Sequence, residues 1–107
     1  MFARSHRFSF RNGVPAKVFS TPNFIIRYDK NDRESLECAV VVGKKVDKRA
    51  VARNRIKRQI VALIKEILDD KIDFRIVIYA KKSIIETSIG QKKEELEKIF
   101  TKTNILK

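Results

Sequence analysis

The positive side chains of this sequence are concentrated in one short segment. Positions 44 to 58 hold eight lysines and arginines and a single acid, Asp47, so they carry +7 of the formal net charge of +12. The eight are Lys44, Lys45, Lys48, Arg49, Arg53, Arg55, Lys57 and Arg58. Like charges this close repel one another and destabilise a folded chain, whereas guanidinium groups grip phosphate oxygens and stack on bases. The segment therefore predicts a polyanion-binding surface, in which Asn54 could read a base edge or a 2′-hydroxyl.

The residues of a self-sufficient nuclease are not indicated by the sequence. Metal-dependent cleavage of a phosphodiester needs carboxylates that converge on one or two cations, but the thirteen acids are scattered along the chain. His6 is the only histidine, which excludes a histidine acid–base pair. Cys38 lies in the apolar run CAVVV, where a thiol is expected to be buried and inert. We expect no catalytic residue and no metal ligand in this chain.

Length and composition predict one domain over residues 1–107, with a modest core, because 43% of the residues are apolar. The charge indicates a polyanionic partner, either a nucleic acid or an anionic membrane surface, of which the membrane is the weaker alternative. No apolar run approaches the roughly 18 residues that a spanning helix needs, and the start does not resemble a signal peptide. With one cysteine there can be no internal disulfide, so we predict a cytoplasmic protein. We also expect no membrane partner and no obligate protein partner.

Three strands and two helices are predicted to position the basic segment. The strands cover residues 24–29, 38–44 and 74–80, where β-branched and aromatic residues gather. A helix is expected from about Lys48 to Leu68, with Asp47 as its N-cap. A last helix is expected after the capping box of Ser88 and Gln91. Residues 1–22 are expected to be irregular or to hold only a short helix.

The middle helix has an apolar stripe whose members recur every three or four residues. They are Ala52, Ile56, Ile60, Leu63, Ile64 and Ile67. Arg49 and Arg53 project on or near the same side, and a buried unpaired arginine is very costly. We therefore expect the start of this helix to overhang the sheet. The predicted fold is α+β, a small two-layer sandwich of three or four mostly antiparallel strands with helices on one face.

The segment VVVGKKVDKRAVARNRIKRQI resembles the signature of the bacterial ribonuclease P protein component, an RNR helix preceded by a strand and a KK turn. FIIRY, FRIVIYA and EELEKIF also resemble the family's first strand, later strand and closing helix. Members of that family join a large catalytic RNA and remove the 5′ leader from precursor tRNA. The resemblance implies a left-handed βαβ crossover, ribonuclease P RNA and precursor tRNA as partners, and cleavage by the RNA with Mg²⁺.

The resemblance also implies roles for particular residues of the basic segment. Arg53, Asn54, Arg55 and Arg58 would be the central contacts with the catalytic RNA. Lys45, in the KK turn, would lie beside them.

Two aromatic residues would hold the single-stranded leader by the same resemblance. Phe19 and Tyr28 match family aromatics that line a cleft, where stacking on a base contributes roughly 1–3 kcal/mol. The sequence departs from the family at Pro15, which stands where a long first helix has an earlier phenylalanine. Phe8 or Phe10 could substitute, or the first helix is shortened to one or two turns.

Two other classes of nucleic-acid-binding protein share the size and charge. A ribosomal or other structural RNA-binding protein would have a similar basic surface without a catalytic complex. A helix-based DNA binder is disfavoured, because the basic helix is flanked by predicted strands instead of a short turn and a second helix.

Overall fold

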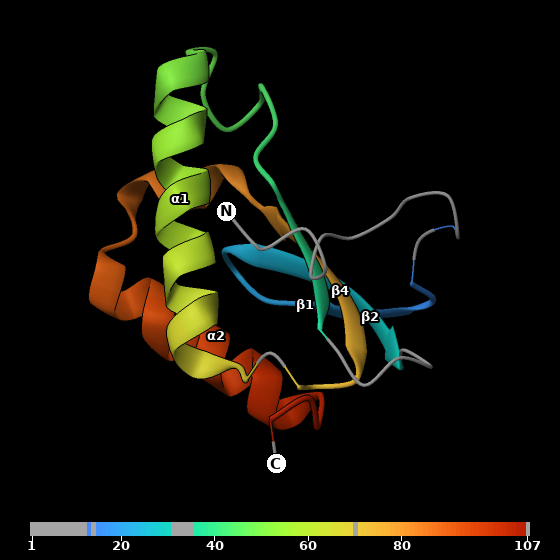
Figure 1. Cartoon of the computed structure of the whole chain (residues 1–107). Helices are drawn as coiled ribbons and strands as arrows, with labels where there is room; N and C mark the ends of the chain where they lie inside the picture. The colour runs from blue at the N-terminus through green and yellow to red at the C-terminus, as the bar shows by residue number, and fades with distance from the viewer. Residues whose placement is uncertain (1–12, 14, 31–35, 70, 107) are drawn as a thin grey trace.

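Four strands form one sheet, and two helices cover one of its faces (Figure 1). The computed structural model describes residues 13, 15–30, 36–69 and 71–106. Its strands are β1 (Lys17–Ser20), β2 (Phe24–Lys30), β3 (Glu37–Val41) and β4 (Phe74–Ala80), and its helices are α1 (Ala50–Ile67) and α2 (Ile89–Lys102). A single 3-10 segment in the described residues, η3 (Lys82–Glu86), joins β4 to α2. The α+β prediction is confirmed, with element boundaries shifted by a few residues.

The sheet is mixed, with the strand order β1-β2-β4-β3. β2 pairs antiparallel with both β1 and β4, whereas β3 and β4 are parallel neighbours joined through α1. Parallel strands end at the same edge of a sheet, so the segment after β3 and the segment after β4 meet there. This edge holds residues 42–49, which lead into α1, and η3.

β1 is a strand where irregular chain or a short helix was predicted. Phe19 pairs with Ile26 of β2 across a tight turn. Glu95 of α2 fixes that turn by accepting hydrogen bonds from the Thr21 hydroxyl and from the backbone and side-chain amides of Asn23. The prediction over residues 17–20 was wrong because a carboxylate about 70 residues away orders this turn. The predicted loop at 31–35, together with Phe8 and Phe10, lies outside the described residues.

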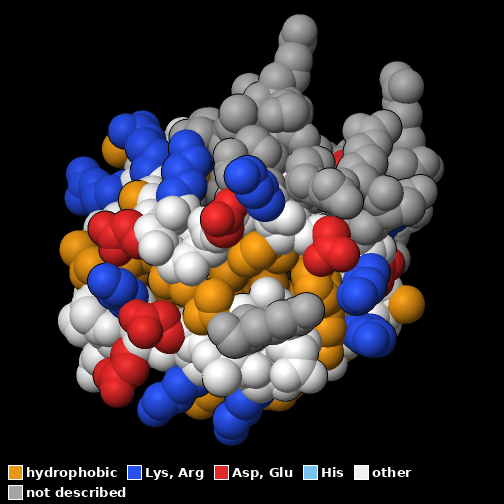
Figure 2. Space-filling view, turned by 60° about the horizontal axis from the view of Figure 1, so that its bottom comes forward, with side chains coloured by type: hydrophobic (Ala, Val, Ile, Leu, Met, Phe, Trp, Pro, Cys, Tyr) orange, Lys and Arg blue, Asp and Glu red, His pale blue; other side chains and the backbone are white. Residues whose placement is uncertain are grey.

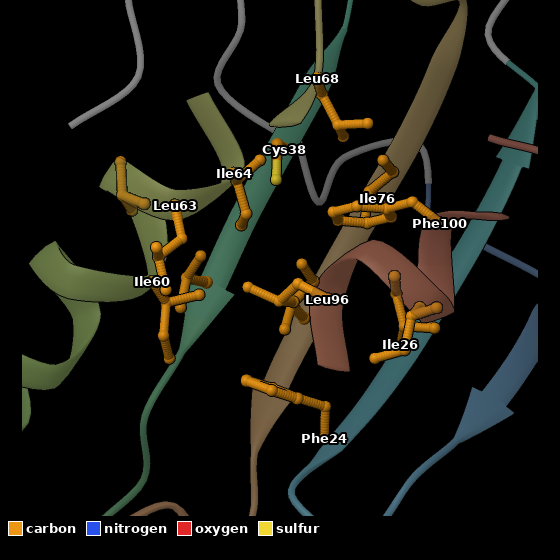
Figure 3. Packing of buried hydrophobic residues seen from close by; sticks show 14 of the residues in the cluster. Phe24, Ile26, Cys38, Ile60, Leu63, Ile64, Leu68, Ile76, Leu96 and Phe100 are labelled. Carbon is orange, nitrogen blue, oxygen red and sulfur yellow. The ribbon is translucent and has the colours of Figure 1, made fainter. Parts of the chain in front are cut away.

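The core lies between the helices and the facing side chains of β2, β3 and β4 (Figure 3). In α1 the buried residues are Ile60, Val61, Leu63 and Ile64. Residues 50–59 include none, so the green N-terminal turns of α1 extend past the sheet in Figure 1. The predicted overhang is confirmed, and Ala52 and Ile56 of the predicted stripe are only partly buried.

One charged side chain is buried between the two helices. Lys92 of α2 is only 5% exposed, and its Nζ donates to Oε1 of Gln59 of α1 at 2.9 Å. Burial lowers the pKa of Lys92 below its ordinary value of 10.5. Replacing a buried charge by an apolar side chain of similar length is often stabilising. We expect Lys92→Met to raise the free energy of unfolding by about 1 kcal/mol at neutral pH, as measured by urea denaturation.

The pH dependence of this gain follows from the lowered pKa. As the pH rises toward 10.5, the unfolded chain binds more protons at Lys92 than the folded chain does. The contribution of this group to wild-type stability therefore increases with pH, and the advantage of Lys92→Met shrinks. Lys98→Met, at an exposed position of the same helix, is the control. A less stable Lys92→Met variant would show that the bond to Gln59 outweighs the cost of burial.

Candidate RNA interface

The basic overhang, residues 44–59, projects beyond the sheet with its charges largely unneutralised. Of the nine side chains predicted to bind RNA, seven are exposed, and only Arg53 and Lys57 are partly buried. The first turn of α1 contains no acidic residue. The free backbone N–H groups at this end add partial positive charge. The result is a strongly positive projection that nothing in the described core covers.

Positive and negative side chains are mixed on the face of the molecule shown in Figure 2. Figure 2 looks toward the end of the molecule opposite the basic overhang. Over most of that face, lysines and arginines are interspersed with aspartates and glutamates around exposed apolar side chains. The mixed charges of this face contrast with positions 44–58, which carry +7 of the formal net charge of +12.

Asn54, Arg55 and Arg58 form the outward side of the overhang. All three are exposed, and none makes a hydrogen bond or ion pair with another side chain in the part of the chain that the structure describes. Guanidinium groups without an internal acid partner are available to bind phosphate in two-point contacts. These side chains are thus accessible to a partner, and their contact with RNA stays a prediction.

Arg53 is turned back on the segment that precedes α1. Its Nη1 donates to the carbonyl oxygens of Asp47, at 3.0 Å, and of Lys48, at 2.8 Å. A guanidinium has five N–H donors, so one part of Arg53 stabilises the loop while the remaining donors can still meet a phosphate. The structure thus gives Arg53 a conformational role that the sequence did not indicate.

Asp47 does not cap α1, contrary to the prediction. The N-cap is Arg49, which has no side-chain capping bond. Oδ1 of Asp47 accepts from the backbone N of Arg49 at 2.9 Å, and Oδ2 accepts from Nη2 of the same residue at 3.1 Å. The hydrogen bonds from Arg49 lower the pKa of Asp47, and those to Asp47 raise the pKa of Arg49. The prediction failed because this carboxylate lies two residues before the N-cap and accepts its hydrogen bonds from Arg49.

A basic hollow of about 480 Å³ lies where the segments after β3 and β4 meet. It is lined by Lys44, Lys45, Val46, Asp47, Lys48 and Lys82. Lys82 was not predicted, because it follows β4 and lies 34 residues beyond Lys48 in the sequence. The parallel pairing of β3 and β4 brings it to this edge. The sequence does contain a signal for Lys82, the lysine pair at 81–82 directly after a predicted strand. This signal becomes informative only when that strand is known to be parallel to the strand before the KK turn.

Phe19 and Tyr28 lie apart from the basic overhang. Both are partly buried against the helix-covered face of the sheet. Tyr28 pairs with Ile76, four residues before the end of β4, which places it about 13 Å along the sheet from the basic edge. Nζ of Lys17 lies 6.0 Å from the centroid of its ring. Phe19 lines a separate hollow of about 730 Å³ between the β1–β2 turn and α2.

Other side chains with possible chemistry were also placed by the structure. Cys38 is 2% exposed, and burial raises the pKa of its thiol, so the predicted burial of this cysteine is confirmed. In the described ranges, no group of three or more His, Cys, Asp or Glu side chains could hold a metal ion. None of the helices seen in those ranges has the length and apolar character required to cross a membrane.

Sequence comparisons connect the chain to known proteins. The family model for ribonuclease P matches residues 4–104. The ribonuclease P protein component of Mesoplasma florum is 36% identical over 98 residues, which cover 89% of this chain and 88% of that relative. The component from Synechococcus elongatus is 32% identical over 114 residues, with 96% and 93% covered.

Solved structures show the same fold. An RNase P protein from Staphylococcus aureus, a mutant with defective mRNA degradation activity, matches with a TM-score of 0.78 at 18% identity and covers 94% of this chain and 90% of its own. The RNase P protein from Thermotoga maritima matches with a TM-score of 0.72 at 19% identity, with 90% and 96% covered.

Proposed function

This chain belongs to the bacterial ribonuclease P protein family, and we propose that it binds the catalytic RNA through the basic overhang and holds the 5′ leader of precursor tRNA. It is a component of ribonuclease P, a tRNA-processing endoribonuclease, and the RNA of that enzyme is its partner. The observation that carries the proposed mode of binding is the outward side of the overhang. There, Asn54, Arg55 and Arg58 have no acid partner in the described residues.

The division of labour in the complex follows from the side chains available. The sequence offers a single histidine and a buried cysteine, so it supplies neither a pair of histidines for acid–base catalysis nor an accessible cysteine nucleophile. We propose that the RNA subunit cleaves the phosphodiester with Mg²⁺ in the cytoplasm. The protein neutralises phosphate repulsion, which favours binding of the substrate and of the metal ions that the RNA uses.

Reconstitution tests this function. The purified protein is mixed with bacterial ribonuclease P RNA at low Mg²⁺, and cleavage of precursor tRNA at the mature 5′ end is followed. We expect the protein to stimulate cleavage. Binding of structured RNA without any stimulation would instead support a structural RNA-binding protein.

Phe19 and Tyr28 are the proposed contacts with the leader. They lie on adjacent strands and face the same side of the sheet, because Phe19 pairs with Ile26 and Tyr28 pairs with Lys17. Each ring is only partly buried, so part of its surface remains available for stacking on an unpaired base. The ammonium of Lys17 beside Tyr28 would favour the phosphates of a strand that passes over this ring.

Tyr28→Ala tests the leader contact. Stacking contributes roughly 1–3 kcal/mol per base, and Tyr28 is half-buried, so we expect about a fivefold loss of affinity for leader-bearing precursor tRNA. Affinity for leaderless tRNA should not change. Tyr79→Ala is the matched control, because Tyr79 pairs with Ile25 and faces the opposite side of the sheet. Equal losses with both substrates would assign Tyr28 to core packing alone.

A further inference from the structure

The basic hollow at the sheet edge has one wall made by the loop before α1, and this wall is fixed by internal bonds. Val46 is 5% exposed, and its backbone N donates to the carbonyl of Gly43 at 3.0 Å. Arg53 of α1 donates hydrogen bonds to the backbone carbonyls of Asp47 and Lys48. The backbone that carries Lys44, Lys45 and Lys48 is therefore ordered before any partner binds.

The opposite wall carries Lys82 and is also anchored. Lys81 donates through Nζ to Oγ of Ser20 at 2.8 Å and to the carbonyl of Thr21 at 2.6 Å. Ile84 is fully buried, and its backbone N donates to the carbonyl of Lys81 at 3.0 Å. Lys82 lies between these two anchors with its own side chain exposed. The two lysines after β4 thus have different roles. Lys81 binds the β1–β2 turn through its hydrogen bonds to Ser20 and Thr21, and Lys82 lines the hollow.

The hollow has a strong excess of positive charge. Four lysines and one acidic residue, Asp47, line it, and both carboxylate oxygens of Asp47 already accept hydrogen bonds from Arg49. An ammonium is a compact charge with three rotatable donors, so several of them can surround a tetrahedral phosphate from different sides. Three of these lysines, Lys44, Lys45 and Lys48, belong to the basic overhang, so the hollow lies between the overhang and η3.

We propose that Lys82 completes a phosphate-binding pocket with Lys44, Lys45 and Lys48, which takes a backbone phosphate of the bound RNA. This phosphate is separate from those contacted by Arg55 and Arg58 on the outward side of α1. The proposal rests on the proposed function for the identity of the RNA. It adds a contact from η3, outside the RNR segment, and makes the RNA-binding surface span two parts of the chain.

The pocket is tested with Lys82→Gln against Lys71→Gln. Lys71 is an exposed lysine just before β4, at the end of the sheet opposite η3, so both variants lose one charge. Binding to ribonuclease P RNA is measured from 50 to 200 mM salt. Loss of one phosphate contact lowers the slope of log K against log salt by roughly 0.7–0.9. The affinity loss of Lys82→Gln should thus be about threefold larger at 50 mM than at 200 mM, and Lys71→Gln should keep the wild-type slope.

A crosslinking measurement gives an independent readout. Cys38 is buried, so a cysteine placed at position 82 or 71 is the accessible thiol for attachment of a photoreactive group. We expect Lys82→Cys to crosslink to the RNA and Lys71→Cys not to. If the wild-type protein prefers ribonuclease P RNA but the two glutamine variants have equal slopes and position 82 gives no crosslink, the pocket is wrong and the proposed function stands. If the preference is missing while the slope difference and the crosslink persist on other structured RNA, the pocket stands and the proposed function fails.

Discussion

The double variant Arg55→Gln/Arg58→Gln is expected to bind ribonuclease P RNA about 100-fold more weakly than the wild-type protein. Each guanidinium is exposed on the outward side of the basic overhang and has no acid partner in the described residues. Hydrogen bonds to charged groups contribute roughly 1.5–3 kcal/mol each, and two lost contacts reach this factor. The slope of log K against log salt should fall by about 1.5, which a salt titration of RNA binding measures.

The matched control is Lys98→Gln/Lys102→Gln, which removes the same charge from exposed positions of α2. It should change affinity only slightly, because long-range attraction is screened over about 8 Å at physiological salt. Similar losses in the two double variants would mean that net charge, and not the position of the guanidiniums, controls binding.

Phe100→Ala is expected to lower the free energy of unfolding by about 3–5 kcal/mol. The ring of Phe100 is fully buried between α2 and the sheet, beside Ile76 of β4 (Figure 3). Truncation removes its apolar contacts and leaves a cavity that the neighbouring strands cannot close. A loss of this size is a large fraction of the roughly 5–15 kcal/mol that stabilises a small domain.

Urea denaturation followed by circular dichroism measures this loss. Ile89→Ala is the control on the same helix, since Ile89 is 56% exposed and its truncation should cost well under 1 kcal/mol. A loss below about 1 kcal/mol for Phe100→Ala would mean that α2 is not part of the cooperative core.

The basic segment, the main strands and both helices could be predicted from the sequence because each has a local signal. The periodicity of α1 indicated Ile60 and Ile64 as core residues, and the cost of burying Arg49 indicated the overhang. Val61 was missed because it is buried although it is not one of the residues of the predicted apolar stripe.

Other features depend on contacts between distant parts of the chain. β1 forms beside a turn that Glu95 holds, and Lys82 joins the basic surface only through the parallel pairing of β3 and β4. Neither contact has a signature in the neighbouring residues. Asp47 shows the reverse case. Aspartate is a common N-cap residue and Asp47 precedes α1, but its carboxylate binds Arg49, two residues further on, and does not cap the helix. Local pattern alone does not distinguish such a residue from a true cap.

The uneven support of α1 has a consequence for the free protein. Residues 60–64 supply all of its buried side chains, while Val51 in the first turn is 73% exposed. Backbone amides in the first half are thus protected from solvent exchange mainly by the intrinsic helical preference of about ten residues, which is marginal in water. Opening of α1 therefore begins at its amino end. A polyanion bound there slows this fraying, and part of the binding free energy is used to order the first turns of the helix.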